Sequence, residues 1–429
     1  MAAPPTTWTI PEQSSAIRGL RFGLSPNCLK HRHHNVVLLT SILLRYQERS
    51  QWVSRHSPQM MYNTATRPPE IPPDVKTSVP SHTPTWVHEP GNESRAKATW
   101  LGHASYLLEL PSPPGAARGP RIIFDPVFSE RCSPSQFIGP SRYTGIYFLT
   151  IVSSNIEKTI DVPCNVNDIP AVDIIVLSHN HYDHTDLPTL QTLLENAAGS
   201  TTPHIFVSLN NAKHLSDALN LSPDRVHDLD WWDERVIRLG IPSKNQSNSD
   251  SHEKTVEARV RLTCTPSQHT SGRKGYDRWN SLWGAWVVEE LLPPSSPGNT
   301  WEDVGRKAYF AGDTGYRTVR NEEDEDTAEV CPAFRMVGER FGGVDVALLP
   351  IGAYAPRSMW SNLHASPGDA VRIMTDVRAT RALAMHWGTW VLTSEPVLEP
   401  PILLRQECEK AGIAEDAFLV PALGETVLF

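Results

Sequence analysis

The sequence from Lys97 onward predicts an α/β or layered β architecture built on buried strands. Short apolar runs alternate with polar loops along the whole segment, which is the pattern of strands covered by other layers. Four of these runs lead, within four residues, into histidine or aspartate, and they cover residues 173–178 (DIIVLS), 259–265, 307–310 and 382–385. Residues 188–196 have helical spacing, and Asp186 is the candidate N-cap of that helix.

Composition sets the size of the core and argues against several classes of protein. The chain has 429 residues, of which 39% are hydrophobic and 20% charged, so it can bury at least one large core. A net charge of −9 without a long Lys/Arg run argues against a nucleic-acid partner. The six cysteines form no close pair, which argues against a disulfide framework or a thiolate zinc site and favours a reducing compartment.

The chain divides into three parts, and we expect the main domain over residues 97–429. Residues 1–66 form a poorly defined segment in which Glu48 is the only acidic residue between positions 13 and 60. This bias resembles a mitochondrial transit segment, and an unstructured terminus is the alternative. Residues 67–96 are rich in proline and predict a linker or a wrapping arm. The longest apolar run, residues 36–44, is far shorter than the roughly 20 residues that cross a bilayer. We therefore expect an intracellular protein, either cytoplasmic or peripheral on a membrane, with mitochondria as a further location.

The residues that follow the four apolar runs are of the types that bind divalent metals. They are His179, His181, Asp183 and His184 after the first run, His269 after the second, Asp313 after the third and His386 after the fourth. Imidazole and carboxylate suit zinc and related ions, and one ion takes about three protein ligands while leaving a position for water. A single histidine after a strand means little, because it can be an ordinary surface or core residue. The His-x-His-x-Asp-His pattern with three further ligands in order predicts a centre of two metal ions.

The spacing of the ligands suggests how two ions would share them. His179 and His181 can point at one ion, which His269 completes. Asp183 and His184 lie just beyond and can serve a second ion together with His386. Asp313 has two carboxylate oxygens and is the natural bridge. We expect its neighbours Gly312 and Gly315 to let the backbone approach the metals.

Beyond this motif the chain resembles the N-acylphosphatidylethanolamine-hydrolysing phospholipase D family of the metallo-β-lactamase superfamily. The resemblance runs from about Thr99 to Phe429, and its strings include TWLGHA (99–104), DPVF (125–128), SPSQ (133–136), DWW (230–232), TPSQH (265–269), FAGDTGY (310–316), PIGAY (350–354) and HWGT (386–389). It implies an α+β fold, an αββα sandwich of two mixed sheets flanked by helices. It also implies two Zn²⁺ ions per chain, a membrane phospholipid substrate with peripheral membrane contact, and a homodimer.

The resemblance implies a phosphodiester hydrolase that releases N-acylethanolamine and phosphatidic acid through a metal-bridging hydroxide. Asp313 and His364 would be catalytic, with His364 beside the metals on the loop before a helix. Locally, Ser366 as cap and Pro367 at the first turn predict a helix to about residue 376. A loop histidine that packs on Trp360 is the alternative for His364. His103 is either a histidine near the site or a residue of a strand turn, and we do not assign it as a ligand.

Several features remain open at the level of sequence. Residues 145–152, Trp231-Trp232 and Met359-Trp360 are candidates for a lipid-facing surface or for ordinary core. Residues 145–167, 243–253 and 317–330 look like insertions, and the last of these contains an acidic loop at 321–329 for which solvation is the default interpretation. The alternative functions are a hydrolase of this fold that acts on another ester, lactone, thioester or phosphodiester, and an inactive metal-bound scaffold.

Overall fold

In the computed structural model, the described residues are 75–87, 91–137, 139–142, 162–197, 202–244, 254–274, 277–294, 301–320 and 325–429. Within these ranges the strands form two seven-stranded sheets. The first has the order β14 (Thr426–Leu428), β1 (Lys97–Gly102), β2 (Ser105–Glu109), β3 (Arg121–Phe124), β4 (Ile174–Leu177), β5 (His204–Ser208), β6 (Val226–Leu229). The second has the order β13 (Phe418–Leu419), β12 (Ala379–Met385), β11 (Val344–Pro350), β10 (Val304–Phe310), β9 (Ala285–Leu291), β8 (Thr255–Thr265), β7 (Glu234–Pro242).

Both sheets are mixed and have the same internal plan. In the first sheet the strands from β14 to β3 pair antiparallel and those from β3 to β6 pair parallel. In the second sheet the strands from β7 to β10 pair antiparallel and those from β10 to β13 pair parallel. Parallel strands need covered faces, which explains why their sequences read as continuous apolar runs.

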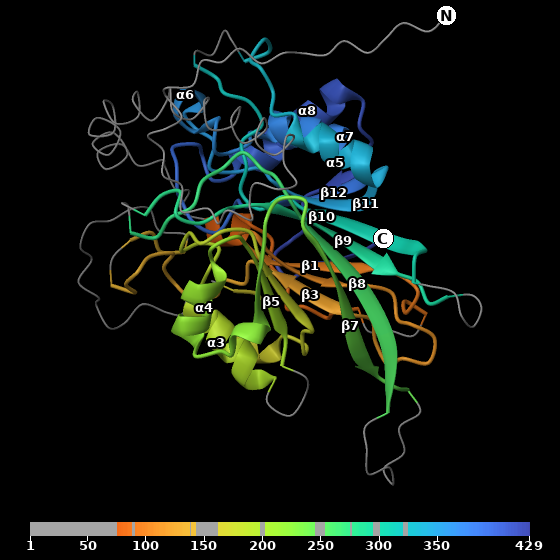
Figure 1. Cartoon of the computed structure of the whole chain (residues 1–429). Coiled ribbons are helices and arrows are strands. Elements are labelled where there is room, and N and C mark those ends of the chain that lie inside the picture. The colour runs from red at the N-terminus through yellow and green to blue at the C-terminus, as the bar shows by residue number, and fades with distance from the viewer. Residues whose placement is uncertain are drawn as a thin grey trace, which may run out of the picture.

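The sheets face each other and helices cover their outer faces (Figure 1). Between the sheets, the rings of Phe124 and Phe310 stack with centroids 4.6 Å apart. Helices α3 (Leu187–Asn196) and α4 (Ala212–Leu219) bury leucines against the first sheet. Helices α5 (Ala333–Phe341), α7 (Pro367–Asp376) and α8 (Glu399–Ala411) lie on the side of the second sheet. Shorter helical elements are α2 (Val75–Ser78), α6 (Arg357–Trp360), η3 (Val166–Asp168) and η4 (Pro223–Arg225). The expected αββα sandwich is confirmed.

The four apolar runs form β4 and the ends of β8, β10 and β12, as predicted. The predicted cap of α7 is also confirmed, because the Ser366 side chain accepts from the Asp369 N–H in a capping box. The predicted N-cap of α3 is confirmed in its position but not in its hydrogen bonding. Asp186 occupies the N-cap position, yet its side chain makes no cap hydrogen bond. The Asp186 carboxylate instead accepts from the N–H groups of Phe128 and Ser129, and so it anchors the loop after β3.

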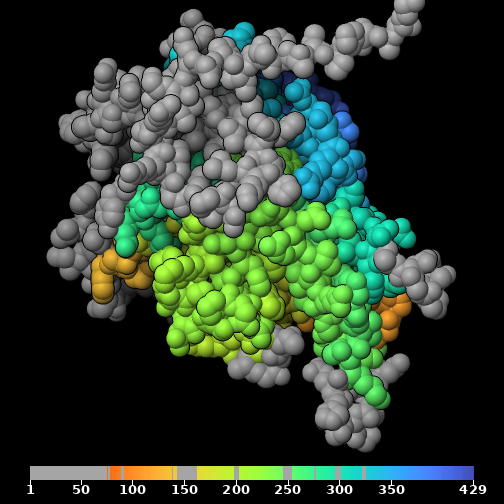
Figure 2. Space-filling view, viewed as in Figure 1, coloured from red at the N-terminus to blue at the C-terminus, as the bar shows by residue number. Residues whose placement is uncertain are grey.

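The described part of the proline-rich segment lies against the main body of the fold. Val75 and Val79 are buried, and His82 donates its N–H to the Leu423 carbonyl at 2.7 Å. Residues 1–66, which carry the transit-like bias, and the apolar stretch 145–152 lie outside the described residues. No helix of the described residues is long and apolar enough to cross a membrane. On the face shown in Figure 2, the α3–α4 layer (yellow-green) adjoins the β7–β8 edge (green).

Candidate metal centre

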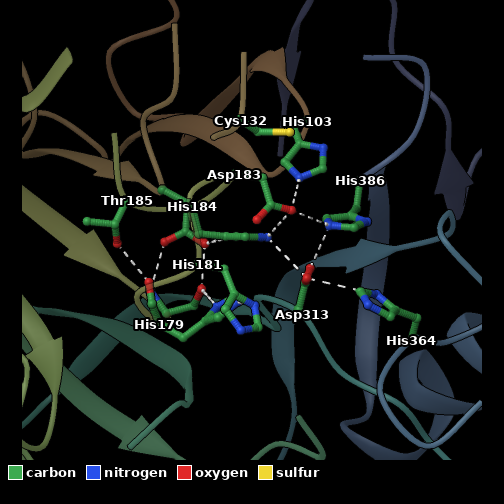
Figure 3. A network of polar contacts seen from close by, with 12 residues as sticks. His103, Cys132, His179, His181, Asp183, His184, Thr185, Asp313, His364 and His386 are labelled. Atoms are coloured by element: carbon green, nitrogen blue, oxygen red, sulfur yellow. Dashed lines mark hydrogen bonds and ion pairs between the residues drawn. The ribbon is translucent and has the colours of Figure 1, made fainter. Parts of the chain in front are cut away.

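Strand ends from both sheets meet at one buried cluster of histidine and aspartate side chains (Figure 3). The segment after β4 supplies four of the predicted ligands, and the ends of β8, β10 and β12 supply one each. The structure therefore brings together all seven: His179, His181, Asp183, His184, His269, Asp313 and His386. Ends of packed strands are rigid, so they hold side chains at fixed distances.

Three histidines form the first group. His179 Nε2 lies 2.8 Å from His181 Nδ1, and His269 Nε2 lies 3.3 Å from the same atom. The other ring nitrogens of two of them have neutral partners, since His179 Nδ1 is 2.9 Å from Ser178 Oγ and His269 Nδ1 is 2.9 Å from the Leu363 carbonyl. Such partners fix the ring orientation and leave the facing nitrogens free to bind an ion.

Asp183, His184 and His386 form the second group, and Asp313 lies between the groups. His184 Nε2 is 3.1 Å from Asp313 Oδ2, and His386 Nε2 is 2.9 Å from Asp313 Oδ1. Asp183 Oδ2 is 3.5 Å from His184 Nε2 and 3.7 Å from His386 Nε2. Asp313 Oδ2 also lies 3.7 Å from His269 Nε2 of the first group. Asp313 thus contacts both groups, which is the position expected of a bridging carboxylate.

Asp125, at the end of β3, is a site residue that the sequence argument missed. Its fully buried carboxylate lies 2.6 Å from His184 Nδ1 and accepts from both the N–H and the hydroxyl of Ser178, at 2.8 Å and 2.5 Å. It therefore orients a histidine of the second group and the segment that leads into the first. Asp125 directly follows the apolar run of residues 121–124, which is the same signal that marked the other site residues.

His103 lies near the site and also in a strand turn, so both alternatives from the sequence apply. It lies in the turn between β1 and β2 with φ of 49°, and its Nε2 is 3.1 Å from Asp183 Oδ2. Its ring centroid is 4.0 Å from that of His386, so it belongs to the wall of the second group. Asp125 and His386 also have positive φ, of 38° and 62°. Such conformations cost on the order of 1–3 kcal/mol each and gather where surrounding structure enforces a functional geometry.

The glycines beside Asp313 allow other protein segments to lie close to this strand end. Gly312 has φ of 57°, and a Cβ there would lie 2.5 Å from Ser178 Cβ. A Cβ on Gly315 would lie 2.5 Å from the Ser361 carbonyl oxygen. Both glycines therefore allow neighbouring protein segments to approach, and those segments carry the site residues. The close contacts are with protein atoms and not with the ligand atoms themselves.

His364 lies beside the cluster and also packs on Trp360. Its Nδ1 is 3.8 Å from Asp313 Oδ2, and its ring meets that of His269 with centroids 5.2 Å apart. The centroid of the Trp360 ring is 5.8 Å away in an edge-on contact. The ring of His364 therefore contacts both of its expected neighbours, the site cluster and Trp360. Met359 and Trp360 are half-buried, whereas Trp231 is buried and donates its indole N–H to the Trp283 carbonyl, so Trp231 is core.

Burial and charge set the protonation of the cluster. Burial lowers the pKa of His103, His269 and His364 to about 3 and that of His181 to about 4, so these rings are neutral at neutral pH. Burial opposes protonation of His386 too, but the adjacent Asp313 carboxylate raises its pKa to about 9.

The cluster fits a divalent metal ion. His184 Nε2, His386 Nε2 and Asp313 Oδ1 are buried, and none makes a hydrogen bond of normal geometry to another described residue. An unsatisfied buried polar atom costs about 1–3 kcal/mol, and an ion at the centre would satisfy all three. Neutral imidazole and carboxylate are the donors that zinc and similar ions take.

A cavity of about 620 Å³ adjoins the segment that carries the first four site residues. Asn180 and Tyr182 of that segment line it, and the guanidinium of Arg273 lies 3.8 Å above the Tyr182 ring centroid. Arg131 and Lys274 also line this cavity. Asp186 and Asp277 line it as well, so cationic side chains outnumber carboxylates by three to two in a cavity beside the segment that follows β4.

Two mixed sheets with a buried His/Asp cluster at their strand ends define a metal-dependent hydrolase. The family described as a beta-lactamase superfamily domain matches residues 120–387, and the chain belongs to this metallo-β-lactamase superfamily.

Three relatives show where in the superfamily the similarity lies. An uncharacterized protein of Mycobacterium tuberculosis is 32% identical over 342 residues, which is 79% of this chain and 70% of that protein. N-acyl-phosphatidylethanolamine-hydrolyzing phospholipase D 1 of Caenorhabditis elegans is 29% identical over 367 residues, 83% of this chain and 82% of that one. The mitochondrial N-acyl-phosphatidylethanolamine-hydrolyzing phospholipase D of Saccharomyces cerevisiae is 30% identical over 361 residues, 84% of this chain and 62% of that one.

Proposed function

We propose that this hydrolase is a phospholipase D that contains two zinc ions and converts N-acylphosphatidylethanolamine to N-acylethanolamine and phosphatidic acid. The observation that carries the proposal is the position of Asp313, which contacts two separate groups of ligands and has His364 beside it. The names of the worm and yeast relatives supply the substrate.

In this proposal each group of ligands holds one ion. His179, His181 and His269 would hold the first, Asp183, His184 and His386 would hold the second, and Asp313 would be shared by both. When bound, the two ions would activate water and neutralise charge on the phosphodiester. Asp125, whose carboxylate lies 2.6 Å from His184 Nδ1, would hold the His184 ring so that its Nε2 is free to bind the second ion.

His364 is proposed to contact the substrate directly. Burial beside other imidazoles keeps the ring neutral. A neutral ring carries one N–H, which can donate a hydrogen bond to an oxygen of the phosphodiester next to Asp313. The proton that the departing N-acylethanolamine oxygen requires would come from water, because a neutral imidazole donates a hydrogen bond but does not give up its N–H proton.

A lipid substrate requires the protein to contact a membrane surface. Of the surfaces proposed from sequence, the one at Trp360 lies beside His364 and suits this role, whereas Trp231 is buried. The cationic residues of the cavity near Tyr182 would favour an anionic phospholipid. The same proposal includes peripheral membrane contact and a homodimer. It also includes a mitochondrial location, which the name of the yeast relative suggests.

The test is to incubate zinc-loaded protein with mixed micelles of N-acylphosphatidylethanolamine and to quantify the products by mass spectrometry. Asp313→Asn is the site variant. Asp345→Asn is the matched control, because Asp345 is partly exposed on β11 and pairs with Arg306. We expect both products from the wild type and the control and neither from Asp313→Asn. Failure of the metal-loaded wild type to cleave the phosphodiester would refute the proposed substrate.

A further inference from the structure

Two arginines and two carboxylates form a cluster behind the loop that carries His364. Arg317 Nε donates to Asp369 Oδ1 at 2.7 Å, and Arg357 Nη2 donates to Asp369 Oδ2 at 2.5 Å. Arg357 Nε also donates to Glu325 Oε1 at 2.9 Å, and Arg317 Nη1 donates to the Glu325 backbone carbonyl. The side chains of Asp369 and Arg317 are 0% and 5% exposed. Planar guanidinium groups that bind two acceptors each make a rigid cluster.

The cluster connects to the metal centre through two consecutive residues. Arg357 Nη1 donates to the His364 carbonyl at 3.3 Å, and the His364 N–H donates to the Trp360 carbonyl at 2.8 Å. The preceding residue, Leu363, offers the carbonyl that orients His269. A shift of residues 363–364 would therefore move both a candidate catalytic ring and the partner of a candidate ligand.

Glu325 belongs to the acidic loop, for which solvation was the default interpretation. Asp326 is 90% exposed, and its carboxylate lies at 3.9 Å from Arg317 Nη1 and 3.4 Å from Arg372 Nη2 without an ion pair to Arg357. Glu325 is 31% exposed and pairs with Arg357, so solvation alone does not describe it. The base of the loop is closed by a bridge between Arg317 and Val330. The described part of this loop is therefore attached to the cluster that supports the His364 loop.

We propose that Glu325 is a positioning residue, which acts through Arg357 to fix residues 363–364 and with them the His364 ring and the orientation of His269. Without the Glu325 carboxylate, Asp369 is the one ionic partner that the Arg357 guanidinium keeps among the described residues. The guanidinium that donates to the His364 carbonyl is then held by one carboxylate in place of two. Asp369 also caps α7, so its loss would damage the fold as well as the loop. Glu325 is exposed enough to be replaced without that damage.

The test compares Glu325→Ala with Asp326→Ala, which removes the same charge from the next residue of the loop. Both are prepared with cobalt in place of zinc, and the electronic absorption of bound cobalt reports the geometry of the ligand groups, His269 included, without any substrate. We expect a changed spectrum for Glu325→Ala and an unchanged one for Asp326→Ala, at equal metal content. With N-acylphosphatidylethanolamine, kcat of the zinc form of Glu325→Ala should fall about 10- to 100-fold while KM stays within about twofold, because small misplacements of reacting groups have effects of this size.

Glu325→Gln, which keeps an acceptor for Arg357 Nε, should recover most of the wild-type spectrum and rate, and it also serves if the alanine variant does not fold. Identical spectra and identical kcat for Glu325→Ala and Asp326→Ala would overturn the inference. The inference rests on the proposed metal centre, and only the kinetic readout also rests on the proposed substrate. If the wild type does not cleave the phospholipid, the proposed function fails, while the cobalt spectra still decide whether Glu325 positions the loop.

Discussion

The two ligand groups of the centre look alike in composition but differ in charge. The first contains three histidines whose outer partners are neutral, a hydroxyl and a carbonyl. The second is surrounded by three carboxylates, Asp125, Asp183 and Asp313. Burial lowers the pKa values of His181 and His269 to about 4 and about 3, whereas the carboxylates outweigh burial at His386 and raise its pKa to about 9.

This difference means that one half of the site is ready for a metal ion at neutral pH and the other half is not. The histidines of the first group are neutral and can bind at once. Those of the second group hold protons that a metal ion must displace. In exchange, the second group offers a negative charge that attracts a cation more strongly once the protons have left. The two ions should therefore differ in how they respond to mutation and to pH.

Asp183→Asn should give the largest effect and should separate the two halves. The substitution removes a charged ligand from the second group and leaves the three histidines of the first unchanged. We expect the second ion to be lost, the first to be retained, and phosphodiester hydrolysis to fall by about 10²- to 10³-fold, the usual cost of removing one electrostatic contributor. Metal analysis of dialysed protein checks this. Loss of both ions, or of neither, would show that the groups do not act as separate sites.

The pH dependence of metal binding should sharpen the comparison. Below about pH 9 His386 of the metal-free protein is protonated, and the neighbouring carboxylates also raise the pKa of His184 well above its usual value, so affinity at the second group should rise with pH up to about 9. For each proton displaced the change is roughly tenfold per pH unit. Affinity at the first group should stay nearly constant from pH 6 to 9, because its rings are already neutral. Competition with a chelator at several pH values measures both ions, and equal slopes would contradict the assignment.

Asp125→Asn tests whether the outer carboxylate belongs to the second group alone. The amide is the same size but cannot accept from His184 Nδ1 as strongly as the carboxylate does. Loss of such a partner costs about 10- to 100-fold in metal affinity. We expect this loss for the second ion, with a smaller change for the first, which Asp125 reaches only through Ser178. A uniform loss of both ions in titration calorimetry would mean that Asp125 supports the whole segment.

The sequence could predict the candidate ligands because each follows an apolar run, and a strand end is a local feature. Asp125 also follows an apolar run. It was missed because a single aspartate after a strand does not form a metal-binding pattern. The side chain of Asp186 could not be placed, because its partners at residues 128–129 are almost 60 positions away in the chain. For the same reason the pairing of Glu325 with Arg357 depends on how α6 packs, which no spacing encodes.

Gly312 is where the two halves of the site touch, and its substitution should give the smallest effect. Gly312→Ala would place a Cβ 2.5 Å from Ser178 Cβ at a φ of 57°, so it combines backbone strain with a steric clash between the segments that carry Asp313 and His179. Gly342→Ala is the matched control, because Gly342 has φ of 68° and nothing lies within 4 Å of its Cβ position. We expect Gly312→Ala to lower the free energy of unfolding by about 1–3 kcal/mol more than the control does, which is the usual cost of overpacking. Equal losses in denaturant unfolding would mean that the two segments can move apart at little cost.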